Sequence, residues 1–251
     1  MSTIAKAGRL LDLFSAARPE WGVSEVAVSL GIPRSTAHFL LASLTEAGLL
    51  QVRRRGRYEL GWRVVELAEV QRSSSPLAPA ARPVMENFVR RFGETVCLGV
   101  FLRESVLFIN KVVGDAPLSV MGPRVGGRYE AHGFASGRAL LATRPQQTLE
   151  EQLRGRELRN PAGNSVIDPD ELLRELETIR RDGVAFDYGE AVPDVGCVAT
   201  GIRGPKGDVV ASLSLSAPLR RFSGHESEFA VAMRGAAAKV SDRLSSTDWS
   251  A

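Results

Sequence analysis

The sequence predicts an α+β fold divided into two domains. Residues 1–61 show the pattern of three helices followed by a two-stranded hairpin, whereas residues beyond 75 mix helices with strand-like runs. Between these parts, WRVVELAEVQR has the pattern of one more helix, and the Ser- and Pro-rich stretch SSSPLAPAARP follows it. We therefore expect a small domain at 1–61, a linker helix at 62–75 and a larger domain with a largely antiparallel sheet at 76–246. The 251 residues, 44% of them hydrophobic, suffice for two cores.

The first 61 residues carry the signals of a winged helix-turn-helix. IAKAGRLLDLFSAA has an amphipathic helical spacing, with Ala7, Leu10, Leu11 and Phe14 on one side. VSEVAVSLG predicts a second helix with Ser24 as its N-cap and Gly31 as its end. A third helix is expected from Pro33 to Gly48, followed by the strands LLQVRRR and RYELG on either side of Gly56.

The third helix presents two different faces. Residues advance about 100° around a helix axis, so the apolar side chains of the third helix form one stripe toward the core. That stripe consists of Ala37, Leu40, Leu41 and Leu44. Free N–H groups and the helix dipole favour a phosphate near the first turn. The candidate DNA-contacting residues on or beside the outward face are Arg34, Ser35, Thr36, His38 and Phe39.

Positive charge is concentrated in the hairpin. The net charge is +3, and residues 1–72 hold ten Lys/Arg against seven Asp/Glu, so the remainder is balanced. The excess centres on RRRGR, that is Arg53, Arg54, Arg55 and Arg57, which favours contacts with a polyanion. The alternative is a winged helix used for protein contacts, with arginines that only face water. For Phe39, packing on thymine methyl groups and contact with the wing or a neighbouring subunit stay equally open.

The second part of the chain predicts several helices and strands in turn. Strand-like runs are TVCLGVFL, VLFINKVV, LSVM, CVATGI and VVASLSLSA. Helical patterns are ARPVMENFVRRFG, SGRALLAT, QQTLEEQL, DPDELLRELETIRRDG and HESEFAVAMRGAAAKVSDRL.

Three stretches of this part suggest ligand contacts. In EAHGFASGRALLA, backbone N–H groups before an apolar helix can face a small anion. FDYGEAVPDVGCVATGI places Asp187, Glu190 and Cys197 around a turn that leads into a strand. SLSLS alternates serines with leucines, so Ser212, Ser214 and Ser216 share one face. Each has a structural alternative: a helix cap, a buried small hydrophobe and a water-facing strand, respectively.

Other classes of protein are disfavoured. No run approaches the roughly 20 apolar residues that cross a bilayer, so we expect a cytoplasmic protein without membrane contacts. The two cysteines lie far apart and the three histidines are scattered, which predicts neither a disulfide framework nor a metal centre, and no cofactor is indicated.

The N-terminal helix, GIPRSTAHFLLASLTEAGLL and RYELG resemble the DNA-binding domain of the IclR family of bacterial transcription regulators. The family helix typically has an arginine at the position of Phe39. The three C-terminal stretches resemble, in order and spacing, the GAF-like effector-binding domain of the same family.

The resemblance implies an effector site. Backbone amides of Ala135 and Ser136 would bind the ligand, with Leu118 and Met121 as an apolar wall. Arg138 stands where the family usually has lysine, and Glu130 or Ala131 where it has proline. The other residues implied around the ligand are Asp187, Val195, Cys197, Ser214 and Ser216.

The expected function is that of a ligand-responsive transcription regulator and not of an enzyme. Two copies would bind a palindromic double-stranded DNA operator, and effector binding would change their arrangement. The resemblance implies a homodimer or homotetramer and a small organic acid as the effector. The main alternative is an enzyme fused to a nucleic-acid-binding domain, with Cys197 as nucleophile and Asp187 or His132 as acid or base. A third hypothesis, a structural adaptor, predicts no salt-dependent DNA binding.

Overall fold

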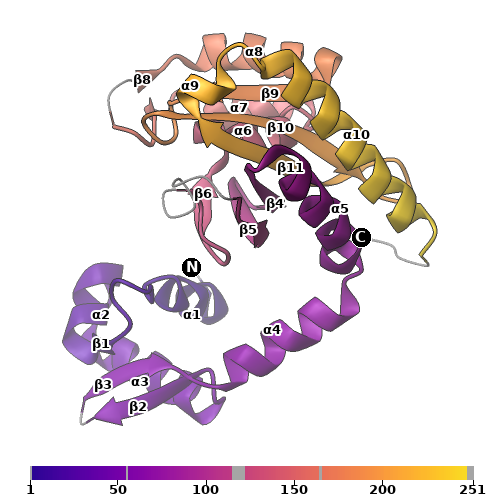
Figure 1. Cartoon of the computed structure of the whole chain (residues 1–251). Coiled ribbons are helices and arrows are strands. Elements are labelled where there is room, and N and C mark those ends of the chain that lie inside the picture. Colours follow the sequence, from indigo (N-terminus) through magenta and orange to yellow (C-terminus); the bar gives the residue numbers. More distant parts are fainter. Residues whose placement is uncertain (1, 55, 115–121, 164–165, 248–251) are drawn as a thin grey trace. The chain divides into compact units, whose positions relative to one another are not determined.

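The computed structural model describes residues 2–54, 56–114, 122–163 and 166–247 (Figure 1). The chain divides into two compact units, Met1–Ser74 and Ser75–Ala251. The α+β fold with an N-terminal winged helix-turn-helix, expected from the sequence, is confirmed. The predicted strand LSVM, with Leu118 and Met121, and the wing residue Arg55 lie outside the described residues.

The first unit is built around three helices and a small sheet. The helices are α1 (Thr3–Leu11), α2 (Val23–Leu30) and α3 (Arg34–Glu46). The sheet has the order β1-β3-β2, with β1 (Trp21–Gly22), β2 (Leu50–Arg54) and β3 (Arg57–Leu60). Leu10, Trp21, Val26, Leu41 and Leu50 form its buried centre. The helices supply most of this core because each has one apolar stripe.

Two details of this unit differ from the sequence prediction. The short strand β1 was not expected. Ser24 does not cap α2: Gly22 is the N-cap, and its N–H donates to Glu25 Oε2 at 2.7 Å. Gly31 does end α2, in a left-handed conformation with φ 63° that suits glycine.

Helix α4 (Arg63–Ser74) follows the hairpin and has no buried residue among those described. The expected Ser/Pro linker is shorter than predicted, because α5 (Leu77–Phe92) already begins within SSSPLAPAARP. Pro79 lies in the first turn of α5, where a missing N–H costs no helical hydrogen bond. Only Ser75 and Pro76 therefore separate the two helices.

The second unit contains a six-stranded antiparallel sheet in the order β6-β5-β4-β11-β10-β9. Strands β9 and β6 were not predicted. The strand bounds are β4 (Thr95–Leu102), β5 (Ser105–Val112), β6 (Arg128–Glu130), β9 (Val184–Tyr188), β10 (Val195–Arg203) and β11 (Val209–Pro218). The short pair β7 (Leu158–Arg159) and β8 (Val166–Ile167) lies apart from this sheet.

Helices cover both faces of the sheet (Figure 1). Helices α5, α9 (Leu219–Phe222) and α10 (Glu226–Ser245) pack on the face that carries Val198 and Leu215. The opposite face, with Ala199, is covered by α6 (Ala135–Leu141), α7 (Gln146–Leu153) and α8 (Pro169–Asp182). Central strands are therefore buried on both sides, and Ser212 and Ser214 do not meet water as the structural alternative supposed.

Candidate DNA-binding surface and effector cavity

Helix α3 presents the outward face that its sequence predicted. Ala37, Leu40, Leu41 and Leu44 are buried in the core of the first unit. Of the candidate contact residues, Thr36 is half-buried, while Arg34, Ser35, His38 and Phe39 are exposed. Because 61% of Phe39 is exposed, core packing does not account for this aromatic residue.

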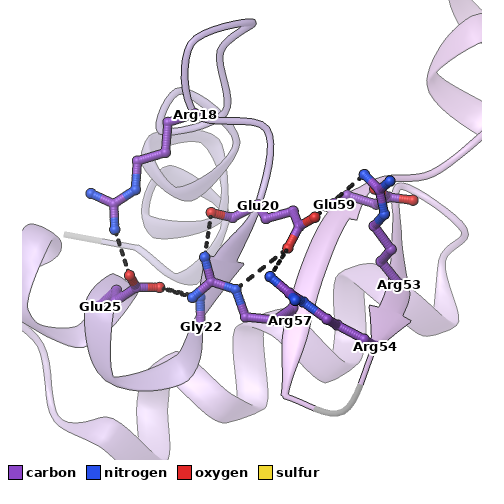
Figure 2. Close-up of polar contacts among 8 residues, drawn as sticks. All are labelled: Arg18, Glu20, Gly22, Glu25, Arg53, Arg54, Arg57 and Glu59. Carbon is purple, nitrogen blue, oxygen red and sulfur yellow. Dashed lines mark hydrogen bonds and ion pairs between the residues drawn. The ribbon is translucent and has the colours of Figure 1, made fainter.

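The wing arginines belong to a network of ion pairs (Figure 2). The Arg57 guanidinium pairs with Glu25, lies 3.6 Å from Glu20 Oε2 and donates to the Glu20 carbonyl at 3.1 Å. Glu25 also accepts from Arg18 at 2.7 Å and from the N–H of Gly22. Arg57, whose side chain is only 30% exposed, thus fastens β3 to the start of α2.

The other two described wing arginines are more open. Arg53 lies 3.3 Å from Glu20 and 3.4 Å from Glu59, and Arg54 lies 3.3 Å from Glu20. Their side chains are 59% and 72% exposed. The carboxylates of Glu20, Glu25 and Glu59, which a count of arginines in the wing does not take into account, neutralise part of the charge of this cluster. Exposed ion pairs of this type are weak and can exchange partners with phosphate.

A small cavity lies in the second unit on the sheet face that α6 covers. It is lined by all seven of the predicted effector residues that the structure describes. These are Ala135, Ser136, Asp187, Val195, Cys197, Ser214 and Ser216. Its other lining residues, which sequence reasoning missed, are Phe108, Gly122, Pro123, Phe134, Ala191 and Val192. The missed side chains are apolar or small and carry no chemical signal in the sequence.

Strand register brings these polar groups together. Cys197 of β10 pairs with Asp187 of β9 on one side and with Ser216 of β11 on the other. Alternate residues of a strand share a face, so Ser214 points to the same side as Ser216. Helix α6 packs close against the turn just before it, since a Cβ at Gly137 would lie 2.2 Å from the carbonyl oxygen of Ala131. Glycine at this position is therefore required for the observed packing.

Asp187 organises the loop that follows β9. Its Oδ1 accepts hydrogen bonds from the N–H groups of Gly189, Glu190 and Ala191 at 3.0, 2.8 and 3.3 Å. Only 3% of Asp187 is exposed, and burial raises the pKa of its carboxyl, against the effect of these N–H groups.

The geometry does not favour a cysteine nucleophile. Burial raises the pKa of the Cys197 thiol, which accepts only a long contact of 3.8 Å from the Ser216 hydroxyl. His132 is absent from the described cavity lining, and its Nε2 lies 3.2 Å from the Arg159 carbonyl and 3.3 Å from Glu130. Within the described residues, no three His, Cys, Asp or Glu side chains could hold a metal together.

Arg138 connects α6 with its surroundings. Its guanidinium lies 3.1 Å from Glu175 of α8 and 2.6 Å from Glu190, and its Nε donates to the His132 carbonyl at 2.8 Å. Only 5% of the residue is exposed. The two carboxylates, both partly exposed, provide the charge compensation that a buried cation needs.

Comparison with known proteins relates both units to transcription regulators. The profile described as "IclR helix-turn-helix domain" matches residues 3–54, and "Bacterial transcriptional regulator IclR C-terminal" matches residues 71–242. The HTH-type transcriptional regulator Rv1719 of Mycobacterium tuberculosis is 30% identical over 249 residues, which cover 99% of this chain and 94% of the relative.

Two solved structures are similar over nearly the full length. An IclR transcriptional regulator from Silicibacter sp. superposes with a TM-score of 0.87 and 27% identity, covering 98% of this chain and 97% of the other. An IclR homologue from Microbacterium hydrocarbonoxydans, in complex with 4-hydroxybenzoate, gives a TM-score of 0.80 and 29% identity, covering 98% and 100%. In the part of this chain that the structure describes, no helix is both long and apolar enough to span a membrane.

Proposed function

The chain belongs to the IclR family of bacterial transcriptional regulators, and we propose that it binds a palindromic operator under the control of a small organic acid held in the cavity beneath α6. Its N-terminal domain is the helix-turn-helix DNA-binding domain and its C-terminal domain the effector-binding domain. The observation that carries the proposal is the convergence of seven predicted effector residues on one cavity.

The chemistry of the lining fits an organic acid. Residues Ala135 and Ser136 line the cavity at the beginning of α6, where backbone N–H groups suit a carboxylate. The hydroxyls of Ser214 and Ser216 suit a second polar group, and Phe108 and Phe134 suit a ring or alkyl chain. Because a relative binds 4-hydroxybenzoate, this acid is a rational first ligand for this chain.

For the DNA side, we propose that α3 enters the major groove through Arg34, Ser35, Thr36, His38 and Phe39. Arg53, Arg54 and Arg55 would contact phosphates, whereas Arg57 would hold the wing in place. Two copies on half-sites about 34 Å apart would read the palindrome.

Helix α4 supports a homo-oligomer, either a dimer or a tetramer. Trp62, Val65 and Val70, at or within this helix, are 75%, 58% and 66% exposed, and a second copy would cover them.

The proposal is tested in two steps. Fluorescence anisotropy on DNA from upstream of the gene, repeated across a salt series, is expected to show affinity that falls steeply with salt. Calorimetry with a panel of carboxylic acids, headed by 4-hydroxybenzoate, is then expected to find a ligand that changes this affinity. A flat salt response would refute the DNA-binding part. A panel without any acid that both binds and alters DNA affinity would refute the sensing part.

A further inference from the structure

The loop of residues 189–194 closes the effector cavity between β9 and β10. Ala191 and Val192 of this loop contribute to the lining. The cavity measures about 30 Å³, whereas cavities that hold organic ligands typically measure about 300 Å³ or more. Part of the wall must therefore move before an acid can bind.

Hydrogen bonds hold the loop to the ends of its two flanking strands, β9 and β10. Asp187 accepts hydrogen bonds from three of its N–H groups, and Val195 N–H donates to the Val192 carbonyl at 3.2 Å. Asp194 adopts φ 61°, a left-handed conformation that is uncommon outside glycine. Such a preformed turn is expected to move as one body on its flanking strands and not to unravel.

Apart from the bonds to β9 and β10, further described contacts fasten the loop to other elements of the domain. The Asp194 carbonyl accepts from Leu219 N–H at 2.8 Å, which fixes the C-terminal end of the loop. Toward the other end, the Glu190 carbonyl accepts a longer bond of 3.2 Å from Ala162 N–H. In addition, Glu190 forms an ion pair of 2.6 Å with Arg138.

This ion pair can open at small cost. When Glu190 leaves, Arg138 keeps Glu175 at 3.1 Å and the His132 carbonyl at 2.8 Å, so the buried cation stays compensated. The side chain of Glu190 is 38% exposed, and its buried Oε2, which faces Arg138, would be hydrated on opening. Repulsion between Glu190 and Glu175, which share one guanidinium, further favours release.

We propose that residues 189–194 form the lid of the effector cavity and that the Arg138–Glu190 ion pair is its latch. The identification of the cavity as the effector site rests on the proposed function. Opening of the lid does not require an effector, so it can be measured on the free protein.

Opening of the lid can be measured from the labelling rates of the chain's two cysteines, Cys97 and Cys197. Cys197 lines the cavity, whereas Cys97 is 1% exposed on the same sheet and does not line it. Burial raises the pKa of both thiols, so both react slowly. Cys97 is buried and Cys197 is partly buried, and opening of the cavity is expected to speed the reaction of Cys197. Labelling of the full-length protein with iodoacetamide, followed by mass spectrometry of its peptides, gives the two rates separately.

Glu190→Gln is the test variant and Glu175→Gln the matched control. Each removes one carboxylate charge next to Arg138, and both side chains are 38% exposed, but only Glu190 belongs to the lid. We expect Glu190→Gln to raise the labelling rate of Cys197 about tenfold, as for the loss of a half-buried ion pair. The Cys97 rate should stay at the wild-type value in both variants. The Cys197 rate in Glu175→Gln should not rise, because this change removes the repulsion that favours release and leaves Glu190 paired with Arg138.

Three results would refute the proposal that residues 189–194 form a lid. The first is an unchanged Cys197 rate in Glu190→Gln. The second is an equal rise of this rate in both variants, which would mean that Arg138 only stabilises the domain. The third is a parallel rise for Cys97 and Cys197, which would indicate unfolding. None of them bears on whether the cavity binds an acid, which calorimetry measures independently.

Discussion

Replacing Arg54 by alanine is expected to weaken operator binding without loosening the wing. Its side chain is 72% exposed, and its one described carboxylate partner, Glu20, lies 3.3 Å away and retains Arg53 and Arg57. Each lost phosphate contact makes the negative slope of log K against log salt less steep by about 0.9. In a dimer both copies carry the substitution, so the slope becomes less steep by about 1.8. At about 0.15 M salt this amounts to roughly a 30-fold loss of affinity, again for two copies.

Arg57→Ala is expected to have the opposite effect: it should lower the stability of the domain and leave the salt dependence of DNA binding nearly unchanged. The Arg57 side chain is 30% exposed and engages Glu20 and Glu25, so its removal leaves two carboxylates without their shared cation. We expect the free energy of unfolding of the N-terminal domain to fall by about 1–3 kcal/mol. The salt slope should change little, because Arg57 is turned toward α2 and not toward solvent.

Anisotropy titrations across a salt series and thermal unfolding followed by circular dichroism measure the two effects separately. The reasoning is refuted if Arg57→Ala lowers the salt slope as much as Arg54→Ala while its unfolding curve matches the wild type. It is equally refuted if Arg54→Ala leaves the slope unchanged.

Three further predictions concern other sites. Phe39→Ala should keep the wild-type stability, because the ring is 61% exposed, and should lose about 1 kcal/mol of discrimination at one A·T position in binding assays; equal weakening on all DNA would contradict base contact. Cys197→Ala should weaken effector binding in calorimetry by up to about tenfold while operator binding stays unchanged. Glu94 is fully buried 2.8 Å from Arg221, and burial raises its pKa above 4.5 against the effect of Arg221. The Glu94 carboxyl therefore holds its proton more tightly in the folded state than in the unfolded chain. As a result, the free energy of unfolding falls as the pH rises through the raised pKa. Denaturant titrations should find Glu94→Gln more stable than the wild type at pH 8 by an amount that shrinks toward pH 4.5; a constant difference would disprove the titration.

Local patterns were predictable where they are strong. The helix Gln146–Leu153 and the strand Thr95–Leu102 have the bounds that their periodicity indicated. The start of α5 was placed too late, because prolines such as Pro79 break helices in general but are tolerated in a first turn. Strand β1, only two residues long, has no periodicity to read.

The sites were predictable in their chemistry but less in their surroundings. Asp187 and Cys197 stand ten residues apart in the sequence and become direct neighbours through strand register. By contrast, the pairing of Arg57 with Glu25 joins residues 32 positions apart, so a local count of arginines misses it. Ala191 and Val192, which close the cavity, have side chains without any polar group that could single them out.

The order of strands also has a consequence for how the protein is made. Strands β4 and β11 are adjacent in the middle of the sheet, and Ser212 and Gly99, which pair there, are separated by 113 residues. Closing so long a loop is slow, and the C-terminal sheet cannot be completed until β11 has left the ribosome. The longest described strand pairing of the first unit joins Trp21 and Tyr58, 37 positions apart, so this unit can fold much earlier. During synthesis, each nascent chain therefore passes through a period in which a folded DNA-binding domain exists without its regulatory partner.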